Sequence, residues 1–207
     1  DNGYRNSLEE QARLEKLTRR QNEELEELNA SLESKVKART EQLSATLRAL
    51  EQAHANLKKG FLTSIKVFSN LIELREGAMA GHSRRVAELA RRLAQHMKLS
   101  EVEVQDITIA ALLHDIGKFG LPDQLLRKPF SALTSEERAE YVKHPATAQA
   151  ALMALEQLNG AAKLIRSHHE RYDGRGYPDR LSGLAIQPGE RILALVNDYE
   201  AAQQCSL

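Results

Sequence analysis

The 207-residue chain is balanced in charge, with 29 lysines and arginines against 29 aspartates and glutamates. A net charge of zero argues against a nucleic-acid partner, so any phosphate binding has to be local. The single cysteine, Cys205, excludes an intramolecular disulfide framework and a thiolate metal cluster. No apolar run approaches the ~20 residues that cross a bilayer, and no basic-then-apolar signal segment opens the chain. We therefore expect a cytoplasmic protein without a membrane segment.

Residues 8–57 predict one long helix, because they are rich in Glu, Lys, Arg, Gln, Leu and Ala and hold no proline or glycine. The apolar positions keep a heptad a/d spacing in two successive registers. The first register is formed by Leu14, Gln21, Leu25, Leu28 and Leu32. The second register is formed by Val36, Leu43, Leu47, Leu50, Leu57 and Phe61.

The two registers meet between Leu32 and Val36, where a step of four residues replaces the three that a continuous heptad requires. Such a stutter locally unwinds a supercoil, so the segment is either a relay for rotation or a plain spacer helix. In both cases the helix cannot bury its narrow apolar stripe alone. We expect a parallel homodimer with Gln21 and His54 as polar positions in the seam.

A more apolar helix follows Gly60 and is expected to end near Gly77, where a globular domain begins. We therefore divide the chain into a coiled-coil helix, residues 1–60, and a domain, residues 61–207. Capping boxes are expected at Ser100 with Glu103 and at Thr134 or Ser135 with the glutamates that follow. No segment predicts a strand, so the fold class is all-α. Further helices are expected over residues 83–97, 100–114, 135–143, 146–158, 161–169 and 188–202.

Two short motifs in the domain carry metal-ligand chemistry. An apolar helical run delivers His114 and Asp115 at adjacent positions, and the string HHERYDGRGYP occupies residues 168–178. Each motif is followed by a loop that holds much of the domain's glycine and proline, which suits a substrate pocket. Imidazole and carboxylate ligands together favour divalent transition metals over calcium.

A lone His-Asp pair is an ordinary polar contact, but the combination of these motifs with Lys143-His144-Pro145 and with His82 in Gly81-His82-Ser83 resembles the HD-GYP family. The resemblance covers roughly residues 61–202. It implies an HD-type helical bundle that acts as a metal-dependent phosphohydrolase. The implied substrate is the bacterial second messenger cyclic di-GMP, cleaved to linear pGpG, to GMP, or to both.

The same resemblance implies two divalent transition-metal ions, most naturally iron or manganese. Asp115 is the expected bridge, shared by both ions. Lys118 is expected to stabilise charge on a phosphate oxygen, or is only a cation at a helix end. Asp173 is expected to orient a ligand histidine or protonate the leaving oxygen, or only forms an Asp-Gly turn. The implied metal ligands are His82, His114, Asp115, His144, His168, His169 and Asn197.

Substrate contacts are expected from the loop that contains the Gly-Tyr-Pro string. Arg171 and Arg175 would meet phosphates, or face water, and Tyr177 would pack near a guanine, or serve only the structure. In the family this turn is also implicated in contacts with diguanylate cyclases. Residues 28–43 resemble the linkers that join bacterial sensor or receiver domains to output domains, so we expect such an N-terminal domain as a partner.

The chain departs from the family pattern at three places. Asn197 stands where an aspartate ligand is expected, and its neutral amide predicts a weaker first metal. Ala78 stands where three-metal members carry a glutamate, so two metals at most are expected. The family's further arginine-containing segment does not follow before Leu207, which weakens the expected substrate affinity. These departures motivate an alternative function, a weakened module that binds cyclic di-GMP or a protein and acts as a regulator.

Overall fold

The computed structural model describes residues 2–76 and 81–204, with side chains described for residues 8–75 and 81–203. Ala78, Cys205 and Leu207, each of which carried an expectation from the sequence, lie outside the described residues. Over the described ranges the chain is helical and contains no strand, only an isolated bridge between Asp173 and Ser182. The expected all-α fold is confirmed. No helix within these ranges is long and apolar enough to span a membrane.

Helix α1 runs without interruption over Asn2–Glu76 and contains both the heptad segment and the apolar segment after Gly60. The sequence had suggested two consecutive helices, but Gly60 is tolerated inside one exposed helix at a cost of about 1 kcal/mol. Two compact units meet within α1, residues 1–59 and 60–207. The leucines of both heptad registers in the first unit are exposed, among them Leu14, Leu25, Leu28, Leu43, Leu47, Leu50 and Leu57.

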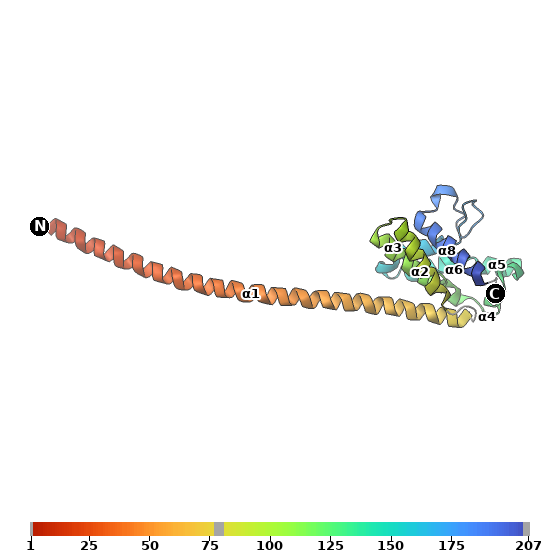
Figure 1. Ribbon diagram of the computed structural model, residues 1–207, viewed down its shortest axis with the longest axis horizontal. Coiled ribbons are helices and arrows are strands. Elements are labelled where there is room, and N and C mark those ends of the chain that lie inside the picture. Colours follow the sequence, from red (N-terminus) through yellow and green to blue (C-terminus); the bar gives the residue numbers. More distant parts are fainter. Residues whose placement is uncertain (1, 77–80, 205–207) are drawn as a thin grey trace. The chain divides into compact units, whose positions relative to one another are not determined.

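The second unit is a helical bundle whose core lies between α2 (His82–His96), α3 (Glu101–Leu113) and α8 (Pro188–Gln204). Helix α7 (Asn159–Arg166) packs on α3, and α6 (His144–Leu152) packs on α7. Figure 1 labels α2, α3, α6 and α8 in this unit. Small residues on α2 allow the close approach of its neighbours. The core includes the fully buried residues Val86, Ala90, Ala94, Ala110, Ala111, Ile165 and Leu193.

Short elements connect the bundle helices. A second, smaller core beneath α4 contains Leu121, Leu125 and Leu133. The short elements are the 3-10 helices η1 (Ile116–Gly120), η2 (Phe130–Ala132), η3 (Glu156–Leu158) and η4 (Gly183–Ala185), with α4 (Asp123–Leu126) and α5 (Ser135–Tyr141).

Both expected capping boxes are confirmed, with Ser100 and Glu103 at the start of α3 and with Thr134 and Glu137 at the start of α5. The single helix expected over residues 146–158 was wrong. Helix α6 ends at Leu152, because the extended backbone of Leu155 turns the chain before η3. The helix expected over residues 161–169 also ends earlier, at Arg166, which leaves two histidines just past its last turn.

Candidate metal centre

Three histidines lie at or just past the last turn of a helix and bond back to a carbonyl oxygen of that turn, and one of them, His144, is also the first residue of α6. His114 ends α3, His144 follows α5, and His168 follows α7. The last four carbonyl groups of a helix have no partner within the helix, so they are available to nearby donors. The Nδ1 atoms of the three rings lie 2.9, 2.8 and 2.5 Å from the carbonyl oxygens of Ala111, Tyr141 and Ile165, respectively.

These bonds fix which ring nitrogen carries the proton. A carbonyl oxygen can only accept, so Nδ1 is the donor in each ring and Nε2 keeps its lone pair. The Nε2 atoms of His114, His144 and His168 are buried and make no hydrogen bond. An unpaired buried polar atom costs roughly 1–3 kcal/mol, and a backbone carbonyl on the opposite ring nitrogen is typical of metal-binding histidines. The three rings therefore fit a metal.

The first group consists of His82, His114 and Asp115, whose candidate ligand atoms all lie within 4.8 Å of one another. All three residues are buried. The Nε2 atom of His114 lies 3.2 Å from Asp115 Oδ2. Asn197, from α8, adds a fourth candidate ligand atom, because its Oδ1 lies 3.2 Å from His82 Nε2. The first group thus combines two imidazoles with one carboxylate and one amide.

The second group consists of His144, His168 and His169, and it contains imidazoles alone. The rings of His168 and His169 lie 4.0 Å apart between centroids, and His144 lies 5.5 and 5.1 Å from them. The two groups are neighbours, because the His114 and His168 rings are 5.3 Å apart. Six of the seven expected ligands therefore fall into two adjacent groups, and the seventh, Asn197, lies beside the first group.

Asp115 lies where the two groups meet. Gly117 allows this approach, because an added Cβ would come within 1.9 Å of the His144 carbonyl oxygen. The Nζ atom of Lys118 lies 2.9 Å from Asp115 Oδ2. Burial alone would raise the pKa of Asp115, but the His114 ring and the Lys118 ammonium together hold that pKa well below its usual value. A carboxylate that stays ionised here can take part in both groups.

Burial also keeps the imidazoles of the second group neutral. It lowers the pKa of His144 to about 4, and it holds the pKa values of His168 and His169 well below the ordinary value of histidine. For His114, burial acts to lower the pKa, but the Asp115 carboxylate outweighs it and the pKa is raised. Metal ions bind neutral imidazole and ionised carboxylate, so the lowered pKa values of the second group and of Asp115 favour a divalent metal, whereas a metal at His114 has to displace the proton that Asp115 stabilises there.

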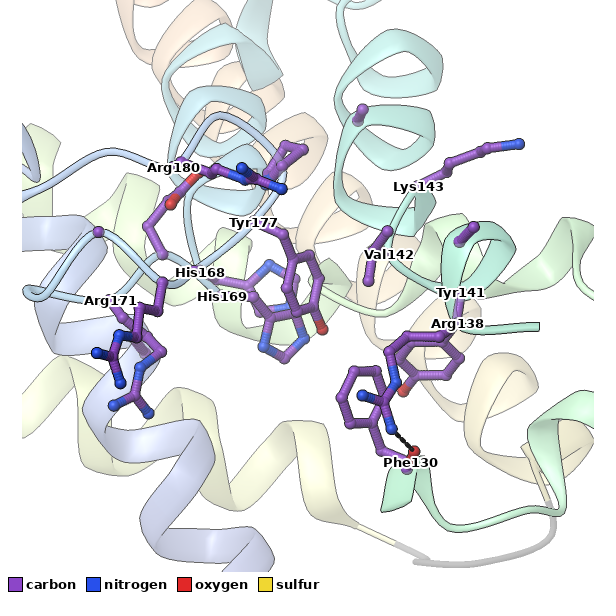
Figure 2. A pocket seen from close by; sticks show the side chains of 18 of the residues that line it. Phe130, Arg138, Tyr141, Val142, Lys143, His168, His169, Arg171, Tyr177 and Arg180 are labelled. Carbon is purple, nitrogen blue, oxygen red and sulfur yellow. Dashed lines mark hydrogen bonds between the residues drawn. The ribbon is translucent and has the colours of Figure 1, made fainter. Parts of the chain in front are cut away.

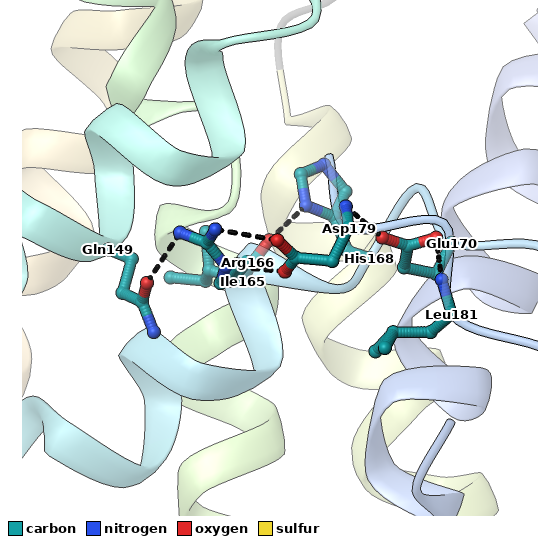
Figure 3. Close-up of polar contacts among 7 residues, drawn as sticks. All are labelled: Gln149, Ile165, Arg166, His168, Glu170, Asp179 and Leu181. Atoms are coloured by element: carbon teal, nitrogen blue, oxygen red, sulfur yellow. Dashed lines mark hydrogen bonds and ion pairs between the residues drawn. The ribbon is translucent and has the colours of Figure 1, made fainter. Parts of the chain in front are cut away.

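The loop that follows the second group is held by a buried carboxylate. Glu170 accepts hydrogen bonds from the backbone N–H groups of Asp179, at 2.6 Å, and Leu181, at 3.0 Å (Figure 3). Arg166 pairs with both oxygens of Asp179, at 2.6 and 2.7 Å. Gly176 has no room for a side chain, because an added Cβ would lie 2.4 Å from the Arg171 nitrogen. The loop is therefore fixed against the second group.

A cavity of about 1220 Å³ opens beside the second group (Figure 2). His168 and His169 line its inner wall, and Tyr177 stacks on His169 with ring centroids 4.7 Å apart. Aromatic and basic side chains along one wall suit a ligand that carries bases and phosphates. The remaining walls include Phe130, Arg138, Tyr141, Lys143, Arg171, Arg175, Arg180 and Asp198.

The expected substrate residues Arg171, Arg175 and Tyr177 all line this cavity, but the structure does not bring Asp173 to the histidines. Its carboxylate contacts Arg171, at 2.9 Å, and accepts the backbone N–H of Arg175, at 3.1 Å. Backbone carbonyls, not Asp173, orient the ligand-type histidines described above. The structure therefore gives no support to a histidine-orienting role for Asp173, the expected Asp-Gly turn agrees with its contacts, and its role as a proton donor to the leaving oxygen stays a prediction.

Sequence reasoning missed several residues of the site. Asp198 lines both the large cavity and a smaller one of about 260 Å³, which is shared with His82, Asp115, Lys118 and Asn197. Glu73, at the end of α1, lines the smaller cavity too. Their signals in the sequence are weak, since Asp198 follows Asn197 by one helical step and Glu73 lies in an amphipathic helix far from any motif.

Comparisons with known proteins agree with this geometry. A protein-family model of the HD domain matches residues 66–207. The chain is 39% identical over 132 residues to the cyclic di-GMP phosphodiesterase response regulator RpfG of Xanthomonas campestris pv. campestris (strain 8004), covering 63% of this chain and 35% of that protein. It is 33% identical over 151 residues to 3'3'-cGAMP-specific phosphodiesterase 3 of Vibrio cholerae serotype O1, covering 72% and 33% respectively.

Among solved structures, the chain is similar to Bd1817, an HDG"Y"P protein from Bdellovibrio bacteriovorus, with a TM-score of 0.52 and 25% identity. That match covers 59% of this chain and 40% of the other. The chain spans about a third of the length of the two curated relatives above, 35% and 33%.

Proposed function

The chain belongs to the HD domain family, as an HD-GYP protein, and from that premise we propose that it is a metal-dependent phosphodiesterase that hydrolyses cyclic di-GMP. Addition of one water molecule across a phosphodiester bond gives linear pGpG, and addition of a second gives two molecules of GMP. Iron or manganese would supply Lewis-acid activation of water and of the phosphoryl group. The ligands would be the first group with Asn197 and the second group with Asp115.

One observation carries this proposal: three buried histidines present an Nε2 lone pair that no hydrogen bond satisfies, while a backbone carbonyl holds Nδ1 of the same ring. A structural histidine in a core would use both nitrogens or expose one to water. Three such rings beside an ionised carboxylate favour a metal site over a packed core.

The residues around the metal ligands support binding of a phosphate. Lys118, near Asp115 and only 14% exposed, would place its ammonium near a non-bridging phosphate oxygen as charge develops on it. Arg171 and Arg175 would hold the second phosphate at the mouth of the large cavity. Tyr177, fixed on His169, would offer the other face of its ring to a base.

Turnover of cyclic di-GMP and 3'3'-cGAMP by the manganese- or iron-loaded chain, resolved by chromatography, tests the function and the choice of substrate together. The proposal expects hydrolysis of cyclic di-GMP with a higher kcat/KM than that of cGAMP. A preference for cGAMP would reassign the substrate, whereas metal-loaded protein that binds cyclic di-GMP without cleaving it would favour the regulator. The neutral amide of Asn197 is the observation behind that second function.

We further propose that the chain forms a parallel homodimer through α1, in support of which the heptad leucines of residues 8–57 are exposed. The same proposal divides the chain into a coiled-coil helix and an HD-type domain, with a sensor or receiver domain linked to the helix. It also includes contacts with diguanylate cyclases. We place the protein in the cytoplasm, where the messenger is made. Sedimentation of residues 1–207 and of a variant with Leu43 and Leu50 changed to Ser would test the dimer.

A further inference from the structure

The last turn of α1 contacts the chain on both sides of His82. Glu73 Oε2 accepts the backbone N–H of Gly81 at 2.6 Å, and Glu73 Oε1 accepts that of Ser83 at 2.7 Å. These N–H groups belong to the start of α2, which has no side-chain cap of its own. A carboxylate at a helix N-terminus satisfies free donors and interacts favourably with the helix dipole. Glu73 therefore fixes the backbone that carries His82.

Two residues further along the same turn, Arg75 contacts the end of η1, the segment that follows His114 and Asp115. Its guanidinium donates to the carbonyl oxygens of Phe119 and Leu121, the latter at 2.8 Å, and pairs with Asp123 at 3.1 Å. It also lies over the Phe119 ring, 4.9 Å from the centroid. A cation that bonds the last carbonyls of a helix stabilises that end.

Glu73 and Arg75 thus hold the two segments that bring the first group together, one carrying His82 and the other carrying His114 and Asp115. Their hydrogen bonds and ion pairs go to residues 81, 83, 119, 121 and 123. The second group is built on α6 and on the chain after α7, where none of these bonds leads. The Glu73 contacts are therefore confined to the first group, whereas Arg75 holds η1, which follows the shared Asp115 and also packs on α6.

We propose that Glu73 and Arg75, here called the α1 clamp, are positioning residues that set the geometry of the first metal group, with Glu73 acting on that group alone. The inference rests on the proposed two-metal function, and it adds two residues outside the recognised motifs. Because the clamp belongs to the helix that carries the heptads, a displacement of its last turn would change occupancy of the first group.

The expected size of the effect follows from partners that orient metal ligands, whose loss typically lowers metal affinity by about 10–100-fold. Glu73→Ala removes both hydrogen bonds beside His82, so the affinity for one of the two bound Mn²⁺ ions should fall by that factor. Glu73→Gln keeps one acceptor oxygen and should recover part of the affinity. Arg75→Ala should act in the same direction, and Lys66→Ala, at an exposed position of the same helix, should have no effect.

Titration of Mn²⁺ into the metal-free full chain, followed by calorimetry and electron paramagnetic resonance, measures each affinity. In a His82→Ala background, Glu73→Ala should cause no further loss, because the first group is already broken. In a His144→Ala background it should weaken the remaining ion. Equal weakening of both ions, or no change in the His144→Ala background, would overturn the clamp.

A metal-free measurement separates the clamp from the proposed function. Amide hydrogen exchange at Gly81 and Ser83 should accelerate by about tenfold or more in Glu73→Ala, with α6 and α7 unchanged, which also shows that the variant is folded. If the unaltered chain bound no Mn²⁺, the proposed function would fail. The exchange pattern would still show whether Glu73 holds the backbone on both sides of His82. Exchange that is unchanged at Ser83, or accelerated throughout, would overturn it.

Discussion

The two histidine groups lie side by side, yet they differ in chemistry and in support. The second group has imidazoles only, packed against one another, and two of them are held by backbone carbonyls three residues earlier in the chain. The first group mixes imidazole, carboxylate and amide and depends on contacts from α1. One group is thus set by local structure and the other by tertiary contacts, so we expect the first to be more sensitive to change.

Removal of the shared carboxylate should have the largest effect on turnover and metal content, because both groups would use it as a ligand. Asp115→Ala should lower cyclic di-GMP turnover by roughly 10³-fold, since several kcal/mol of transition-state stabilisation depend on the metals. Metal content should fall from two ions to one or fewer. A variant that retained both ions and normal turnover would exclude Asp115 as a shared ligand. Glu156→Ala, at an exposed carboxylate outside both groups and outside the large cavity, is the matched control.

Acid should destabilise the second group, whereas the first group contains titrations of both signs, because the pKa of His114 is raised and those of His82 and Asp115 are lowered. The pKa of His144 is about 4 in the folded chain, against roughly 6.5 when unfolded, so its contribution is present above pH 6.5 and is lost as pH falls toward 4. His168 and His169 behave alike, whereas the raised pKa of His114 adds stability as pH falls.

The metal-free protein should therefore be less stable at pH 5 than at pH 7, by about 2 kcal/mol from His144 alone. Urea unfolding at both pH values measures this difference. In His144→Ala the pH dependence should shrink, and in His114→Ala it should grow. A free energy of unfolding that rises on acidification would contradict the assigned directions.

Lys118→Gln should separate charge stabilisation from metal binding. Loss of the ammonium should lower kcat by about 10²-fold, because it would act where charge develops on phosphate. Both ions should remain, since Lys118 is not a ligand. Loss of metal in parallel with activity would mean that the residue serves only to hold Asp115, its partner at 2.9 Å. Lys143→Gln, at the rim of the large cavity, is the control cation.

Asn197→Asp should have the smallest effect and should make the two groups more alike. A carboxylate beside His82 adds charge to the first group, so its metal affinity should rise by about tenfold while that of the second group stays constant. A large gain in turnover would mark the natural chain as a weakened enzyme. Unchanged affinity at both groups would show that Asn197 is not a ligand.

Much of the site could be predicted because its ligands lie in contiguous motifs. His114 with Asp115 and His168 with His169 are adjacent in sequence, and the helix before His114 could be inferred from its apolar run, whereas the helix before His168 ends earlier than periodicity predicts. The capping boxes at Ser100 and Thr134 could be predicted for the same reason, because both partners of each box lie within one helical turn.

The remaining features depend on contacts between distant residues. Glu73 meets Gly81 and Arg75 meets Leu121 only after α1, α2 and η1 have packed, and no local spacing indicates either bond. The contact of Asp173 was also not predicted, because the motif does not indicate that its carboxylate pairs with the nearby Arg171. Helix α6 stops at Leu152 where helical periodicity continued.

The most direct test of the two-group account is a metal count on the anaerobically purified chain, loaded with manganese or iron, alongside His82→Ala and His144→Ala. The account predicts about two ions in the unaltered chain and one in each variant, with cyclic di-GMP turnover rising in proportion to occupancy by two ions. A chain that binds no metal, or that loses both ions when only His82 is replaced, would contradict it.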